Sequence, residues 1–209
     1  MKQKAFTLYE TLIVIMIIGF LATVLLSTLR PRDITNEGLQ KGGKALYLQI
    51  DYAIMQIIAN HTKNGRLDEI IDGSSVRTIG AATSYSTNIN GSDFFTKFVK
   101  KYIKALRSSS FPSNYKTLAL VDSSGNVPNS SLKISSFNGF QAKNDSYFGI
   151  RLYGNCTTSE TYLYHPAVPS KTTQSNSCGQ IFMDVNGPGL PNKLGIDQYI
   201  VSITMNGVR

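Results

Sequence analysis

The chain has 209 residues, a formal net charge of +8 at pH 7 and 42% hydrophobic residues. This length is enough to bury a hydrophobic core, and it favours one domain of ordinary size over several domains. The basic balance can favour anionic partners such as DNA, lipid headgroups or polysaccharide, but a charged exterior in contact with solvent explains it more simply.

The first predicted element is an apolar stretch from Phe6 to Leu29, in which Glu10 is the single charged residue. A helix of about 20 apolar residues spans the hydrocarbon core of a bilayer. Two lysines precede the stretch, so the positive-inside bias predicts a cytoplasmic N-terminus and an extracytoplasmic remainder. The stretch is too long for an ordinary secretory signal, and a plain membrane anchor gives no reason for Glu10.

The residues around Glu10, KAFTLYETL at positions 4–12, resemble the leader of type IV pilins and of the pseudopilins of type II secretion. The resemblance implies cleavage by a prepilin peptidase between Ala5 and Phe6, and methylation of the new N-terminus at Phe6. It also implies that Glu10 guides assembly. The Glu10 carboxylate can pair with the N-terminal ammonium of a neighbouring subunit, which removes an otherwise isolated charge. Ala5 stands where glycine is commoner in the family, which tolerates this change.

Pro31 follows the apolar stretch and should kink or loosen the helix, because proline removes a backbone donor. Beyond it, apolar residues recur mostly every three or four positions and predict an amphipathic helix that continues to about Ala59. This second half of the helix is expected to bury its stripe on a globular domain. The residues of the stripe are Leu39, Leu46, Ile50, Ile54 and Ile57.

A second helix is predicted from Asp93 to about Arg107, after a stretch rich in Gly, Ser, Thr and Asn that indicates loops. Lysines recur at i, i+3, i+4 and i+7 opposite an aromatic face, a pattern that could bind DNA phosphates. A surface helix packed by its aromatic side, with its lysines in solvent, explains the same pattern, and we favour that interpretation. The lysines are Lys97, Lys100, Lys101 and Lys104.

After Arg107, short alternating runs separated by turn residues predict strands of an antiparallel sheet. We therefore expect an α+β fold, in which a long N-terminal helix, membrane-spanning in its first half and amphipathic in its second, packs on this sheet as in pilins. The expected segments are a leader at 1–5, a transmembrane assembly helix at 6–30 and an extracytoplasmic domain at 31–209. The predicted strands are Lys116–Val121, Tyr147–Tyr153, Thr161–His165, Gln180–Val185 and Gln198–Thr204.

Cys156 and Cys178 are the two cysteines of the chain. An even pair placed downstream of a predicted membrane span and outside the cytoplasm favours a disulfide. Metal binding by the pair is not favoured, because neither histidine, His61 or His165, shows the spacing of a metal ligand.

The run from 184 to 197, DVNGPGLPNKLGID, resembles the D-x-N-G…P-N…G-x-D segment of many pilin-like proteins. Its acidic and amide side chains offer hard oxygen ligands, and related secretion pseudopilins bind calcium in a C-terminal loop, so Ca²⁺ is a candidate cofactor. Asx turns that join two strands explain the same residues without a metal, and both interpretations stay open. The candidate ligands are Asp184, Asn186, Asn192 and Asp197.

The sequence contains no G-x-S-x-G or H-E-x-x-H motif and no other recognisable catalytic set, so we expect no enzymatic activity. The resemblance implies a pilin or pseudopilin, a structural subunit of a type IV pilus or a type II secretion-like filament. Its expected partners are the prepilin peptidase, sister subunits and an inner-membrane platform with its ATPase. The expected location is the bacterial inner membrane, crossed once, and then a periplasmic or cell-surface filament. The alternative is a minor pilin whose basic helix binds DNA or a surface.

Overall fold

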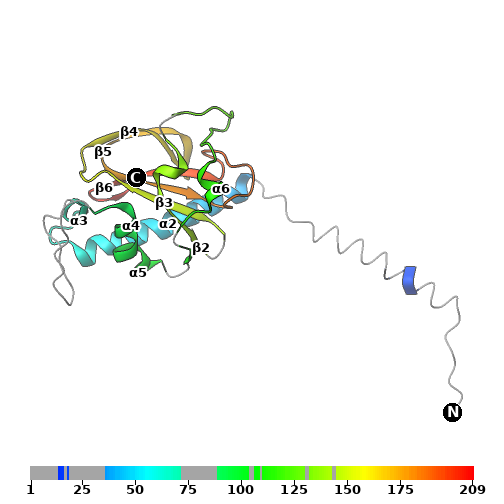
Figure 1. The fold of residues 1–209 in the computed structure, drawn as a ribbon, viewed down its shortest axis with the longest axis horizontal. Coiled ribbons are helices and arrows are strands. Elements are labelled where there is room, and N and C mark those ends of the chain that lie inside the picture. The colour runs from blue at the N-terminus through cyan, green and yellow to red at the C-terminus, as the bar shows by residue number, and fades with distance from the viewer. Residues whose placement is uncertain are drawn as a thin grey trace, which may run out of the picture. The chain divides into compact units, whose positions relative to one another are not determined.

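The computed structural model describes residues 14–16, 18, 36–71, 89–103, 106–108, 110–129, 132–142 and 145–209 (Figure 1). The chain divides into two compact units, Met1–Thr35 and Asn36–Arg209. In the first unit, residues 14–16 and 18 are helical and their side chains are exposed. The sheet, the named helices and both hydrophobic clusters belong to the second unit.

The longest helix of the second unit is α2, Asn36–His61, which runs along one face of the sheet (Figure 1). The apolar residues of the predicted stripe, which recur mostly every three or four positions, are buried as the sequence predicts. Glu37 in the first turn matches the positive end of the helix dipole. The shorter helices are α3 (Asp68–Ile71), α4 (Gly91–Phe94), the π-helical η1 (Phe95–Val99), α5 (Lys100–Tyr102), α6 (Ser113–Lys116) and the 3₁₀ turn η2 (Ile134–Ser136).

The strands form one antiparallel sheet in the order β1-β2-β3-β5-β4-β6-β7. The long strand β5 pairs with β4 in its first half, and its second half lies between β3 and β6. Strand β4 also meets β6 at the pair Tyr164–Ile200, so the sheet curls back on itself. The strands are β1 (Leu106–Ser108), β2 (Asn138–Ala142), β3 (Tyr147–Leu152), β4 (Thr158–His165), β5 (Val168–Asp184), β6 (Gln198–Thr204) and β7 (Gly207–Val208).

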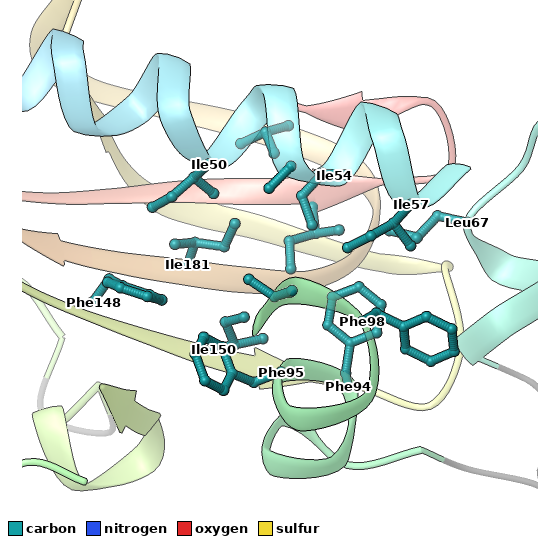
Figure 2. Close-up of a cluster of buried hydrophobic side chains, with 14 of the residues drawn as sticks. Ile50, Ile54, Ile57, Leu67, Phe94, Phe95, Phe98, Phe148, Ile150 and Ile181 are labelled. Carbon is teal, nitrogen blue, oxygen red and sulfur yellow. The ribbon is translucent and has the colours of Figure 1, made fainter. Parts of the chain in front are cut away.

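Both faces of the central strands are buried, and successive residues point to opposite faces. In β5, Ile181 and Met183 join the cluster under α2, whereas Phe182 joins the cluster on the other face. Figure 2 shows the first cluster, in which Ile54 and other α2 side chains point towards β3, β5 and the phenylalanines of α4 and η1. The second cluster is covered by the segment from Phe111 to Phe137, so the sheet lies between two layers.

The predicted long N-terminal helix with a membrane-spanning half is wrong. The first long helix begins at Asn36, beyond Pro31, and among the described residues no helix is long and apolar enough to cross a membrane. The same finding overturns the predicted single-pass location in the inner membrane. The prediction joined the apolar stretch and the amphipathic stripe across Pro31, yet α2 itself carries Lys41, Lys44 and Asp51 and is suited to a sheet surface. Residues 1–13, 17 and 19–35 lie outside the described residues.

The second predicted helix is also shorter than expected. It is built from α4, η1 and α5 and ends at Tyr102, where Ile103 turns to extended backbone. A π-helical segment pairs residues i and i+5 where an α-helix pairs i and i+4, so the side chains there depart from the predicted helical phase. The predicted strand from Lys116 forms only isolated bridges at Ala119 and Val121, whereas β6 has the predicted bounds.

Candidate functional site

The predicted leader and assembly residues, Ala5, Phe6 and Glu10, lie outside the described residues, as does Lys104 of the basic stripe. Their roles stay predictions. The described residues nevertheless form a surface and a buried network that bear on the function.

The outward side of α2 carries an exposed apolar stripe. Leu48, Tyr52 and Met55 follow one another at helical spacings of four and three, and 63%, 62% and 47% of their respective surfaces are exposed. The buried stripe lies on the opposite side of the same helix, where Ile50 and Ile54 are almost completely covered by the sheet. Helix α2 is thus apolar on two sides, and the sheet of its own domain uses only one of them.

Polar contacts hold this helix at one edge of the sheet. The Tyr47 hydroxyl donates a hydrogen bond of 3.3 Å to the carbonyl oxygen of Val208 in β7. The Tyr47 ring packs edge-on against His165 at the end of β4, with ring centroids 4.3 Å apart. We refer to Leu48, Tyr52 and Met55 as the α2 outer stripe. Because the buried stripe and Tyr47 hold α2 on the sheet, the α2 outer stripe is a preformed apolar surface.

The structure brings the four candidate calcium ligands into one buried network between β5 and β6. Asp184 and Asp197 are fully buried. The Asp184 carboxylate accepts hydrogen bonds from the Tyr115 hydroxyl, from the Gln198 side-chain amide at 2.9 Å and from the backbone N–H of Asn186 at 3.2 Å. The network thus ties α6 and the ends of both strands together.

Asp197 fixes the loop itself. Its two carboxylate oxygens accept the backbone N–H groups of Asn192 at 2.8 Å and Lys193 at 2.7 Å. The Gln198 amide also donates to the Asn192 side-chain oxygen at 3.3 Å, and the Asn186 amide donates to the Leu190 carbonyl at 2.9 Å. The contact of the Asn186 N–H with Asp184, two positions back, has the spacing of an Asx turn, whereas the N–H groups that Asp197 accepts lie four and five positions before it.

Burial controls the acid–base state of this network. Desolvation raises the pKa of Asp184 to about 7, although hydrogen bonds from Tyr115 and Gln198 oppose the shift. Desolvation also raises the pKa of Asp197, against the backbone hydrogen bonds that it accepts. Burial and then the Asp184 charge raise the pKa of Tyr115, so its phenol stays protonated and remains a donor.

Whether this network can bind calcium depends on how many of its oxygen atoms are available as ligands. Calcium takes six to eight oxygen ligands, whereas the carboxylate oxygens of this network already accept protein hydrogen bonds. Among the described residues, the side-chain oxygens of Asn186 and Gln198 are buried and have no hydrogen-bond donor. In the described ranges, no group of three or more His, Cys, Asp or Glu side chains could hold a metal. Calcium stays a prediction, and no role is derived from it.

The described lysines of the basic helix do not act as one stripe. Lys97 lies 3.8 Å from the carboxylate of Asp93. The Lys101 ammonium lies 6.0 Å from the centre of the Phe98 ring, and Lys100 is exposed on the last helical turn. These positions fit a surface helix packed by its aromatic face, which is the interpretation that the sequence favours.

The predicted disulfide between Cys156 and Cys178 is confirmed. It joins the loop after β3 to the middle of β5, and both residues are buried in the cluster under α2. The bond therefore has a structural place in the core.

Three features of these sites, the roles of Tyr115 and Gln198 and the α2 outer stripe, were not predicted from the sequence. Tyr115 and Gln198 anchor the Asp184 network from 69 and 14 positions away, and no local pattern marks either residue as a partner. The α2 outer stripe was detectable, because its members repeat at helical spacing out of phase with the buried stripe.

Comparisons of the chain with family models, with curated proteins and with solved structures find no match.

Proposed function

We propose that the chain is a non-enzymatic filament subunit, a pilin or pseudopilin, cut by a prepilin peptidase between Ala5 and Phe6. Its partners are the peptidase, sister subunits and an assembly platform with its ATPase. The KAFTLYETL signal at 4–12 supports processing, and Glu10 pairs with the new N-terminus of a neighbouring subunit.

The α2 outer stripe is the observation that carries this proposal. A domain that folds alone gains nothing from a second apolar side on its main helix, whereas a subunit in a filament covers it with its neighbours. Fully covering a side chain of this size contributes about 1.5–3 kcal/mol, so covering three partly exposed ones contributes roughly 3 kcal/mol per contact. A contact repeated along a filament need not be stronger than that.

The test replaces Leu48 and Tyr52 with serine in the full chain and counts filaments on cells by electron microscopy. We expect at least a tenfold loss of filaments, because the apolar contact is removed, while thermal unfolding of the domain stays nearly unchanged. Val127→Ser is the matched control, since Val127 is a comparably exposed apolar residue on the layer opposite α2. Filaments at normal number in the Leu48→Ser/Tyr52→Ser variant would contradict the role of the stripe.

Processing is tested separately by mass spectrometry of the N-terminus, in cells with and without prepilin peptidase. A chain that begins at methylated Phe6, and that stays uncut without the peptidase, is the expected result. Glu10→Ala should then leave the cut intact and abolish assembly. An intact Met1 in cells that contain the peptidase would overturn the proposal.

A minor pilin that binds DNA is the second candidate, and the observation that favours it is the exposure of Lys100 and Lys101 at the end of the basic helix. Salt-sensitive DNA binding that is lost on neutralising Lys97, Lys100, Lys101 and Lys104 would support this role. Lys97 already has Asp93 as a neighbour, so the structural subunit remains the better-supported function.

A further inference from the structure

A groove of about 650 Å³ lies on the layer that covers the sheet opposite α2. This volume is in the range of small-molecule sites. We call it the lysine-rimmed groove. Its lining residues are Lys116, Thr117, Leu118, Ala119, Leu120, Val127, Leu132, Lys133 and Ser135.

The groove has an apolar base and apolar walls. Leu120 and Leu132 form part of the second hydrophobic cluster and are almost completely buried. Leu118 and Val127 line the same groove with 38% and 51% of their surfaces exposed. Such a concave apolar surface can hold a hydrocarbon chain, since every lining group between the lysines is uncharged.

The charges of the groove are of one sign. Lys116 and Lys133 are its two charged lining residues, and both are exposed. In the described part of the chain, neither ammonium group forms an ion pair with a carboxylate. An occupant that carries an anionic group beside an apolar body would therefore complement the groove in both respects.

The backbone of the groove argues against a peptide strand as the occupant. The N–H groups of Lys116 and Leu118 donate to Pro112 and Tyr115, and that of Leu132 donates to Asn129. Ala119 is already bridged to Lys133. A peptide that adds a strand needs a row of free edge groups, whereas a hydrocarbon chain needs only apolar contact and a partner for its charge.

We propose that the lysine-rimmed groove binds an acyl-chain carboxylate, with the chain along the exposed side chains of Leu118 and Val127 and the carboxylate between Lys116 and Lys133. The inference does not depend on the filament proposal. It is compatible with it, because the α2 outer stripe and the groove belong to opposite layers of the domain and a neighbour on one leaves the other open.

The test uses decanoate as the probe and protection of an introduced thiol as the readout. In the full chain, Val127→Cys is labelled with a small maleimide at increasing decanoate concentrations, and Leu48→Cys on α2 serves as the matched control. We expect decanoate to slow labelling at position 127 at least fivefold and to leave position 48 unchanged. Adding Lys116→Gln and Lys133→Gln should raise the concentration for half protection about tenfold, because two charge-assisted hydrogen bonds are lost. Lys100→Gln with Lys101→Gln should not change it.

Several results would overturn the inference. Absence of protection, or equal protection at positions 48 and 127, would exclude a specific site in the groove. Equal protection by 1-decanol would exclude recognition of the carboxylate by the lysines. Stronger protection by a peptide of alternating leucine and glutamate would mean that the occupant is a polypeptide. A chain that shows no protection but still forms filaments would refute the groove alone, and an uncut N-terminus with normal protection would refute only the filament.

Discussion

At the scale of single residues, the domain buries a carboxyl group among neutral hydrogen-bond donors. Asp184 is fully buried, and its partners are a phenol, an amide and a backbone N–H. These donors offset only part of the cost of removing a charge from water, so the carboxyl holds its proton to an unusually high pH. The sequence shows the aspartate, but its burial depends on residues far along the chain.

This shift makes the stability of the domain depend on pH. The folded-state pKa of Asp184 is about 7, above its ordinary value of 3.8, so the folded state binds the proton more tightly than the unfolded state. The resulting stabilisation is complete below about pH 4 and is lost as the pH rises through 7. Its full size is roughly 4 kcal/mol, at about 1.4 kcal/mol per pKa unit.

Chemical denaturation between pH 4 and 8 measures this contribution. The free energy of unfolding of the unaltered chain should fall relative to that of Asp184→Asn as the pH rises, because the variant has no proton to lose at this position. Asp93→Asn, at a half-exposed position, is the control and should run parallel to the unaltered chain. A constant difference between the unaltered chain and Asp184→Asn would show that the buried carboxyl does not titrate in this range.

At the scale of elements, a glycine of α2 lies against a strand of the sheet. A side-chain carbon at Gly43 would collide with the ring of Tyr199 in β6, which is fully buried. The Tyr199 hydroxyl donates to the Ile196 carbonyl at 2.5 Å, so the ring cannot move aside without losing that hydrogen bond. Gly43 thus allows the helix to lie close to β6.

We therefore expect Gly43→Ala to destabilise the domain, even though alanine favours a helix by about 1 kcal/mol over glycine. Overpacking of a core typically costs about 1–3 kcal/mol, and the helix gain of about 1 kcal/mol offsets part of it, so the net loss in the free energy of unfolding should be up to about 2 kcal/mol. Lys44→Ala, at the adjacent exposed position, is the control and should change stability by less than about 0.5 kcal/mol. A Gly43→Ala variant more stable than the unaltered chain would mean that the helix does not pack at this distance.

The elements also show what local patterns can predict. The buried stripe of α2 and the bounds of β6 follow from apolar periodicity, because both elements bury a regular set of side chains. The first half of β5 is rich in Ser, Thr and Asn and was not predicted, since it gains its partner only when β4 folds back on it. The π-helical η1 was missed because it arises where Phe94, Phe95 and Phe98 fit the core. Local sequence patterns do not predict the backbone conformation where it depends on contact with a segment that is distant in the sequence.

At the scale of the whole molecule, the domain is a sheet with apolar clusters on both faces, and its two layers differ in how they are held. The layer of α2 packs through one continuous apolar stripe, whereas the layer from Phe111 to Phe137 contains short turns and isolated bridges. The network around Asp184 joins the second layer to the sheet through Tyr115. Of this candidate site, the sequence predicted the acidic and amide residues but neither the network nor its buried environment.

The disulfide between Cys156 and Cys178 supports this molecule from the α2 side, because it closes a loop with a sequence separation of 22 residues. Cross-linking a loop of this size contributes about 3 kcal/mol by restricting the unfolded chain. Reduction should lower the free energy of unfolding of the unaltered chain by that amount, as denaturation with and without dithiothreitol can measure. The double variant Cys156→Ala/Cys178→Ala should match the reduced chain and not respond to reductant, which separates loop closure from side-chain packing. If the oxidised and reduced chains were equally stable, the unfolded ensemble would already hold these segments together, and the bond would not be what stabilises this part of the sheet.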